Sequence, residues 1–572
     1  MPMFCPECGS RLDADMAFCP ECGMRVEHEP ADDMESPALK GILFTHIPRL
    51  ARKLSVDPQE IIHLLTSFMQ QKAEQGVFYQ LANAGAVASK GLFNRSKSLA
   101  QDAPWHEYAD VLKQIHDEEA ERGEEPSTFL FILGGDDIIP MPAIPHYLGD
   151  QAGDAEKTID TDLLYAYPYG AQMDEAICSG QLFFQKALFY IGRLPLATDA
   201  VFQDLADYLQ RDVDNRVIEV DAGYGQCDPH WMKVTAQVTG RISREQLFPR
   251  YNSLPKEILY GSLFLTPEVD HQVIGRVFNP NAQLLFFNLH GGAARETSYF
   301  LGQSLKDPTD WRVAIFPEVI ATCSHPNVIV SEACYGARFI GFDKAHSMLL
   351  SAMSANTLLY VGASRVAYGQ ADPHDPGSPV RLSNADVITG EFVNHMLDGM
   401  PAGVALFEAR SRLCEMAEVG PVESTTLVEF NLFGDPTLGI VNRKMGTASM
   451  AAVGSRIGAL FGSATASGRL ENVPIAVGED AKPMSLLAQV RAQVDANLAE
   501  IQSRINEQLY KQWGISPRKP VRMSRTTSLG GQKGYEMLYN LDESGKVPDG
   551  FYNQLSVSSD LNGEIKSVRV TK

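Results

Sequence analysis

Cys334 is a candidate nucleophile because it follows a predicted buried strand. The residues Val328–Val330 are β-branched and apolar, which predicts a short strand buried on both faces. Cys334 follows where this strand ends, directly before a Tyr-Gly pair. In open α/β sheets the reactive crevice lies at the carboxyl ends of the strands, so a thiol at this position is placed for chemistry. A buried structural cysteine is the alternative reading, because free cysteine is among the most buried residue types.

His290 stands in the same kind of position on another predicted strand. The apolar run Leu284–Asn288 ends just before it, and two glycines follow it. A histidine and a cysteine that are far apart in sequence but adjacent in a fold are a candidate base and nucleophile. Gly291 lets the backbone approach a substrate closely, so we expect its N–H and that of Cys334 to hold an oxyanion.

This order of motifs resembles the caspase-like (clan CD) cysteine peptidases, whose pattern is strand-His-Gly followed by strand-x-x-Ala-Cys-x-Gly. Further stretches narrow the resemblance to the gingipain-like branch: F-I-L-G-G-D-D-I-I-P, T-D-L-L-Y-A with I-G-R-L-P, and N-L-F-G-D-P-T-L, in that order within residues 125–442. The resemblance implies an α/β fold with a mostly parallel sheet sandwiched by helices. It also implies an endopeptidase in which Cys334 attacks the carbonyl as thiolate and His290 protonates the leaving amine.

Asp162, in the stretch T-D-L-L-Y, is the specificity residue that the resemblance implies. The matching aspartate lines the pocket of arginine-specific gingipains, so we expect cleavage after arginine and, less well, after lysine. A guanidinium can pair with a buried carboxylate through two parallel hydrogen bonds, whereas lysine offers a point charge. Asp160 is the second candidate for this role. The structural alternative is that Asp162 caps a turn or helix.

Four cysteines near the start of the sequence predict a zinc ribbon. Cys5 and Cys8 form one CxxC knuckle, Cys19 and Cys22 form another, and each knuckle is followed by glycine. Two such knuckles complete a tetrahedral Zn²⁺ site. The site is closed, so we expect it to be structural and to bind a partner or position the chain. Disulfides are the alternative, disfavoured in a reducing compartment.

The rest of the chain predicts several segments around the peptidase-like region. They are a zinc ribbon (1–26), a helical region (37–124), an N-terminal half (125–280) and a catalytic half (281–442) of the peptidase, a flexible linker (443–482), and a small α+β module that opens with a long helix (483–572). In the linker, Arg456 and Arg469 are candidate cleavage sites because an extended segment of small residues is accessible to a protease.

Composition limits the partners of this chain of 572 residues. Its net charge of −22 argues against broad electrostatic binding to nucleic acid or anionic membranes. No apolar run reaches transmembrane length, and no signal-peptide pattern opens the sequence, so we expect a cytosolic protein, unlike the secreted gingipains. Expected partners are protein substrates and a regulatory protein bound through the zinc ribbon or the C-terminal module.

Two other functional classes remain open at this point. One is a catalytically dead relative used as a scaffold, and the other is a zinc-ribbon adaptor whose α/β domain binds a ligand. The intact His-Gly and Ala-Cys-x-Gly motifs argue against decay of the site. The remaining cysteines lack this setting and are expected to be structural: Cys178, Cys227, Cys323 and Cys414.

Overall fold

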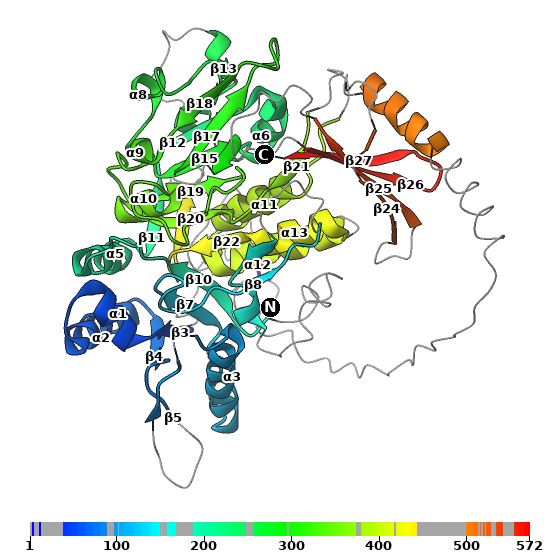
Figure 1. Cartoon of the computed structure of the whole chain (residues 1–572). Helices are drawn as coiled ribbons and strands as arrows, with labels where there is room; N and C mark the ends of the chain where they lie inside the picture. Colours follow the sequence, from blue (N-terminus) through cyan, green and yellow to red (C-terminus); the bar gives the residue numbers. More distant parts are fainter. Residues whose placement is uncertain are drawn as a thin grey trace, which may run out of the picture. The chain divides into compact units, whose positions relative to one another are not determined.

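The computed structural model follows the chain through one large α/β region and a smaller C-terminal sheet (Figure 1). The residues that it describes are 3–4, 11–12, 38–88, 96–100, 102–148, 157–167, 187–242, 244–247, 256–293, 297–372, 379–416, 419–442, 499–512, 515, 519–520, 522–527, 533–541 and 554–571.

The α/β region is built on an 11-stranded sheet. From one edge to the other its strands are β13 (Leu259–Tyr260), β14 (Leu263–Leu265), β12 (Gly223–Cys227), β15 (Leu284–Asn288), β19 (Asn327–Ser331), β20 (Thr357–Ala363), β22 (Phe430–Phe433), β10 (Tyr190–Leu194), β7 (Phe129–Leu133), β3 (Leu39–Thr45) and β4 (Val77–Asn83). The central strands are buried along their whole length, as expected for a sheet covered on both faces.

The sheet changes direction at β22. This strand runs antiparallel to β20 on one side and parallel to β10 on the other. Strands β14, β12, β15, β19 and β20 therefore run one way, and β22, β10, β7, β3 and β4 run the other way. As a consequence, the carboxyl ends of β12, β15 and β19 gather at one edge, and those of β7 and β10 lie at the opposite one.

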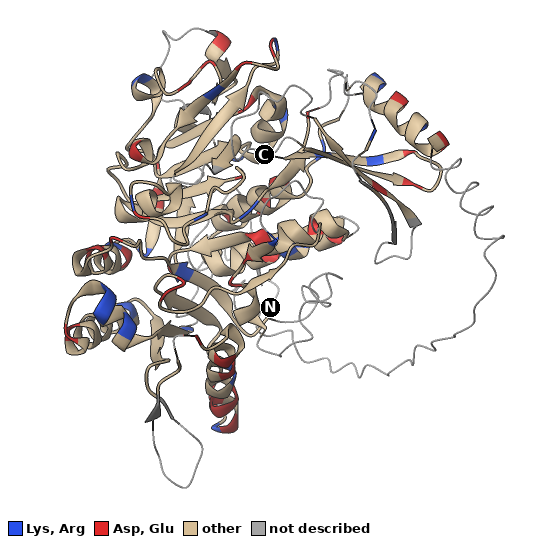
Figure 2. Cartoon of the chain, viewed as in Figure 1, with Lys and Arg blue, Asp and Glu red and all other residues tan. Residues whose placement is uncertain are grey.

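Helices connect the strands and pack on them to close a single large core. Those of seven residues or more are α1 (Ile47–Leu54), α2 (Pro58–Glu74), α3 (Trp105–Glu121), α5 (Phe202–Asp214), α6 (Met232–Val238), α10 (Met348–Ser354), α11 (Ala385–Leu397), α12 (Ala402–Met416) and α13 (Pro421–Glu429). Acidic residues gather along α3, in keeping with the negative net charge (Figure 2).

Two expectations about secondary structure are corrected. The region 37–124 contains α1, α2 and α3, but it also contributes β3 and β4 to the main sheet, so it is not a separate helical segment. The buried run in β3 is too short to fill a helix but suits a strand. The alternation in Trp231–Thr239 predicts a strand. Met232–Val238 instead forms helix α6, whose buried residues Val234, Thr235 and Val238 lie on one helical face.

A five-stranded sheet follows near the C-terminus, in the order β21 (Tyr368–Gln370), β27 (Ile565–Thr571), β26 (Gln554–Asp560), β25 (Lys533–Asn540) and β24 (Arg522–Thr527). Strands β24 to β27, with a helix over 499–512, form the expected α+β module with its own apolar cluster. Strand β21 belongs to the peptidase-like region, so this sheet spans both. At the other end of the chain, β1 (Met3–Phe4) and β2 (Arg11–Leu12) pair antiparallel on either side of the first CxxC knuckle.

Candidate active site

Three neighbouring strands deliver Asp228, His290 and Cys334 to one edge of the sheet. Strand β12 pairs with β15 so that Cys227 lies opposite Asn288, and β15 pairs with β19 so that Phe287 lies opposite Ser331. The three polar side chains follow these strands within one to three residues. This is the edge at which open α/β sheets bind their ligands.

The backbone of Gly291 touches the backbone of Cys334. A Cβ atom placed on Gly291 would lie 1.7 Å from the carbonyl oxygen and 2.8 Å from the nitrogen of Cys334. No side chain fits at this position, so glycine is required by close approach. The histidine loop and the cysteine turn, which are 44 positions apart in sequence (334 − 290), are thus in direct contact.

The ring of His290 is held by two tryptophans and a carboxylate. Its centroid lies 4.5 Å from that of Trp231 and 4.9 Å from that of Trp311. Its Nε2 lies 3.7 Å from Oδ2 of Asp228. Nε2 is thus the ring nitrogen that faces the carboxylate. Aromatic walls fix the ring plane and limit access of water to it.

Asp228 is itself anchored at both carboxylate oxygens. Oδ1 accepts hydrogen bonds from the backbone N–H of His230 and from its ring Nδ1 at 2.6 Å, and Oδ2 accepts one from the N–H of Gln303. Burial alone would raise the pKa of Asp228, but His230 and His290 outweigh it and hold this pKa below its usual value. Burial likewise opposes the charge of His230, and the Asp228 carboxylate overcomes it, so the pKa of His230 is raised. The carboxylate therefore stays ionised beside His290.

The thiol of Cys334 lies against the segment that follows β20. The N–H of Ala367 is directed at Sγ with a nitrogen–sulfur distance of 3.3 Å. The three other cysteines in the described part of the chain are buried, and burial raises the pKa of Cys323 and Cys414 to about 12 and that of Cys227 well above its usual value. These three remain protonated and inert, in line with a structural role.

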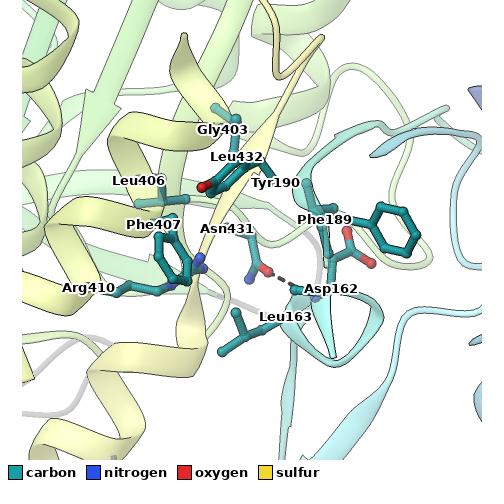
Figure 3. Close-up of a pocket in the computed structure, with 12 residues that line it drawn as sticks. Asp162, Leu163, Phe189, Tyr190, Gly403, Leu406, Phe407, Arg410, Asn431 and Leu432 are labelled. Atoms are coloured by element: carbon teal, nitrogen blue, oxygen red, sulfur yellow. Dashed lines mark hydrogen bonds between the residues drawn. The ribbon is translucent and has the colours of Figure 1, made fainter. Parts of the chain in front are cut away.

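The structure gives the carboxylate of Asp162 a partner within the chain. Arg193 of β10 binds it through Nε at 2.7 Å and Nη2 at 2.6 Å, and both side chains are almost fully buried. Its backbone N–H donates to the side chain of Asn431, in the wall of a small pocket whose lining includes neither His290 nor Cys334 (Figure 3). Strands β20 and β22 separate β10 from β19. The expectation that Asp162 awaits a substrate guanidinium is corrected, because the guanidinium of Arg193 already fills that place.

Asp160 lies nearer to the cysteine turn. It lines a surface pocket together with Ala337, Arg338 and Arg365. Its Oδ2 accepts a hydrogen bond from Arg365 at 2.6 Å, and the carbonyl of Arg365 accepts one from the N–H of Tyr335. Two hydrogen bonds, both made by Arg365, thus connect Asp160 to Tyr335, the residue after Cys334.

The four predicted zinc ligands, Cys5, Cys8, Cys19 and Cys22, lie outside the described residues. The donor set is still informative: four thiolates in two CxxC knuckles suit tetrahedral Zn²⁺ and leave no open position for catalysis. Among the residues that the structure describes, no group of His, Cys, Asp and Glu could hold a metal ion. The same part of the chain has no helix long and apolar enough to cross a bilayer.

Sequence reasoning missed Asp228 and the two tryptophans. The sequence up to Tyr224 predicts a linking segment, whereas Val217–Val220 and Gly223–Cys227 form strands β11 and β12. The run G-Y-G-Q-C is poor in β-branched residues, so propensity gave no strand signal. One feature of the sequence does indicate Asp228: it follows a strand directly, as His290 and Cys334 follow strands further along the chain.

A cysteine and a histidine brought together at the carboxyl ends of parallel strands define the class of α/β cysteine peptidases. Comparison with protein families agrees: the model of peptidase family C25 matches residues 56–441, and a zinc-ribbon model matches residues 4–26. The chain therefore belongs to peptidase family C25 and carries an N-terminal zinc-ribbon domain.

Solved structures with a similar fold include two of gingipains. The Arg-specific cysteine proteinase gingipain R (RgpB) is 12% identical, with 72% of this chain and 80% of that chain covered and a TM-score of 0.44. The complex of Porphyromonas gingivalis RgpB pro- and mature domains is 13% identical, with 70% and 79% covered and a TM-score of 0.44. No curated protein matches the chain.

Proposed function

We propose that this C25 peptidase cleaves proteins with Cys334 as nucleophile and His290 as its acid–base partner. The observation that carries the proposal is the contact between Gly291 and the backbone of Cys334, which joins the two motifs at one point of the sheet. Attack of the thiolate on the carbonyl carbon would form a tetrahedral adduct, and the amine would leave with a proton from His290. Water would then release the acyl group and regenerate the thiol.

The surrounding residues have supporting roles in this proposal. The N–H groups of Gly291 and Cys334 would stabilise the oxyanion of the adduct. Asp228 would orient His290 and stabilise its charged form, as the third residue of a triad does. Trp231 and Trp311 would hold the ring in place and keep water away.

We infer a preference for a basic residue before the cleaved bond, arginine more than lysine. Asp160, in the pocket next to the cysteine turn, is the carboxylate that we assign to this preference in place of Asp162. A carboxylate has about four acceptor sites, so the bond from Arg365 does not exhaust it. Arg338 and Arg365 in the same pocket favour the competing possibility, an acidic residue, and a substrate panel separates the two.

The zinc ribbon is proposed to be structural and to recruit a regulatory protein partner. A cytosolic location stays a prediction from the sequence. The alternative function, an adaptor or scaffold whose caspase-like domain is not catalytic, predicts no turnover from any form of the chain.

Kinetics of two variants test the proposal. We expect Cys334→Ala and His290→Ala each to lower kcat/KM for peptide substrates by at least about a thousandfold, because nucleophile and base act as a unit. Cys323→Ala, which removes a buried thiol outside the His-Gly and Ala-Cys-x-Gly motifs, is the matched control and should retain turnover. Near wild-type turnover by Cys334→Ala or His290→Ala would refute the assignment.

A further inference from the structure

Strand β21 lies directly beside the thiol and has both of its edges covered. It begins at Tyr368, one residue after Ala367, whose N–H is 3.3 Å from Sγ of Cys334. On one edge, Gly369 forms a bridge with Asn384. On the other edge, β21 pairs antiparallel with β27 of the C-terminal module, with Gly369 opposite Val570 (Figure 1).

We propose that the β21 edge covered by β27 is the docking edge for the main chain of substrates, and that β27 is its resident occupant. An extended peptide binds to a sheet edge by adding a strand, and its backbone hydrogen bonds then supply affinity without regard to sequence. Because β21 begins next to the thiol of Cys334, a peptide paired with β21 would pass close to this nucleophile. The C-terminal module would thus block the site until β27 is displaced. This inference rests on the proposed peptidase function.

The opposite edge of β21 is built into the peptidase core and cannot be vacated. Asn384 is buried and directs its side-chain amide at Glu423 and Thr426 of α13. The carboxylate of Asp386 in α11 accepts the N–H of Gln370 at 2.6 Å. A substrate strand that pairs with β21 must therefore take the place of β27.

The module can leave without opening the peptidase core. Its apolar cluster is separate from that of the α/β region and is formed by Ile501, Ile505, Leu509, Met537, Tyr539, Leu555, Val557 and Val568. The segment 443–498, which connects the two, lies outside the described residues and is rich in Ala, Gly and Ser at its start. Two independent cores allow the two parts to separate as units.

Arg569 of β27 links this strand to the peptidase region through an ion pair. It lies opposite Gln370 in the pairing of β27 with β21 and forms ion pairs with Glu423 of α13 and with Glu536 of β25. The side chains of all three charged residues are less than a tenth exposed. Arg569 thus joins a carboxylate of the peptidase region to one of the module. Arg569→Glu would gather three carboxylates at this point and repel the strand.

The register supports occupation of the substrate path. Thr571 lies opposite Tyr368, so β27 runs antiparallel to β21 and reaches the end of β21 that is next to Ala367. A strand in this position occupies the space over the edge along which a substrate would approach Sγ.

The test compares the full-length wild type with Arg569→Glu and Val570→Pro, which removes a backbone N–H from β27. Arg504→Glu is the matched control, since Arg504 pairs with Glu500 on its own helix and with the carbonyl of Asn562, and both partners belong to the C-terminal module. Two quantities are measured: kcat/KM for a fluorogenic peptide, and amide hydrogen exchange at residues 368–370. We expect faster exchange and at least a tenfold rise in kcat/KM for Arg569→Glu and Val570→Pro, with no change in the control. A synthetic peptide of residues 563–571 should inhibit both variants competitively.

Faster exchange at 368–370 without a rise in turnover would overturn the inference, and so would unchanged exchange in both variants. Absence of turnover from every form, with or without faster exchange, would instead refute the proposed peptidase function on which the inference rests. Equal turnover in all forms would support the peptidase function but refute the inference that β27 blocks the substrate edge of β21.

Discussion

Oδ2 of Asp228 lies 3.7 Å from Nε2 of His290. The two residues come from the ends of adjacent parallel strands, β12 and β15. The carboxylate is held by His230 and Gln303, so it is a fixed charge and not a mobile one. In the proposed mechanism Asp228 is therefore the third residue, beside His290 and Cys334.

Asp228→Asn should lower kcat/KM by at least about tenfold. The loss should fall short of the roughly 10⁴-fold effect known for the buried aspartate of a serine triad, because 3.7 Å is longer than a hydrogen bond. Steady-state kinetics measure it. Asp137→Asn, at an exposed site paired with Lys53, is the control and should leave turnover intact. Unchanged kinetics in Asp228→Asn would remove Asp228 from the mechanism.

His230→Gln should lower stability in acid more than in alkali. The pKa of His230 is raised in the folded state because the Asp228 carboxylate overcomes the effect of burial. A raised pKa stabilises the fold fully below the unfolded value of about 6.5 and no longer does so once the pH exceeds the folded value. The difference in Tm between wild type and variant should therefore be largest near pH 5.5 and shrink toward pH 9. A difference that grows with pH would contradict the ion pair.

Asp162→Asn should destabilise the fold without changing specificity. Removing one partner of a buried pair leaves Arg193 uncompensated, which costs about 3–5 kcal/mol of the free energy of unfolding. Asp137→Asn breaks a more exposed pair and should cost about 1 kcal/mol or less. Denaturant unfolding measures both.

The same Asp162→Asn variant, assayed below its unfolding transition, should keep the wild-type ratio of arginine to leucine cleavage, whereas Asp160→Ala should lower it. If the ratio of arginine to leucine cleavage falls in Asp162→Asn and not in Asp160→Ala, Asp162 is the specificity residue. A wild-type preference for aspartate would assign the pocket to Arg338 and Arg365.

Gly291→Ala should abolish most activity. Its methyl group would lie 1.7 Å from the carbonyl oxygen of Cys334, so the histidine loop and the cysteine turn must move apart. We expect a loss of at least about a hundredfold in kcat, comparable with the loss of an oxyanion-hole donor. Gly275→Ala is the control, because no atom lies within 4 Å of the added carbon. Normal turnover in Gly291→Ala would show that the close approach is not needed.

The zinc ribbon should bind one Zn²⁺ per chain and should be dispensable for peptide turnover. Elemental analysis of the wild type and of a Cys5→Ser, Cys8→Ser double variant measures the first part. The double variant should lose the metal but keep kcat/KM, because four thiolates form a closed site that leaves no coordination position for catalysis. Zinc-free wild type, or zinc loss that stops turnover of a small peptide, would contradict this assignment.

The strand-end residues were predictable from the sequence, and the specificity residue was not. Val328–Val330 and Leu284–Asn288 are buried on both faces, so their apolar runs predict strands whatever the rest of the chain does. Asp162 matches a family motif, but its role depends on which basic side chain of the folded protein pairs with its carboxylate. The stretch I-G-R-L-P supplies Arg193 from a strand 31 positions later, and only the tertiary structure pairs them. The same holds for the reversal at β22, which no local pattern encodes.

The pairing of β21 with β27 was also beyond prediction. The C-terminal stretch L-S-V-S-S-D-L-N-G-E-I-K-S-V-R-V predicts strands and a turn, but an edge strand can pair with any accessible edge. Its partner is nearly 200 residues away in the sequence, where Tyr368–Gln370 is too short for a confident strand assignment.

Mapping the site of covalent labelling tests the central claim most directly. The full-length chain and its Arg569→Glu variant are treated with an arginyl peptide that carries a thiol-reactive ketone, and the modified residue is identified by mass spectrometry. The Cys-His assignment predicts one label per chain, on Cys334, faster in Arg569→Glu and at least about a hundredfold slower in His290→Ala. Labelling that falls on Cys227, Cys323 or Cys414, or that reaches Cys334 at the same rate without His290, would contradict it.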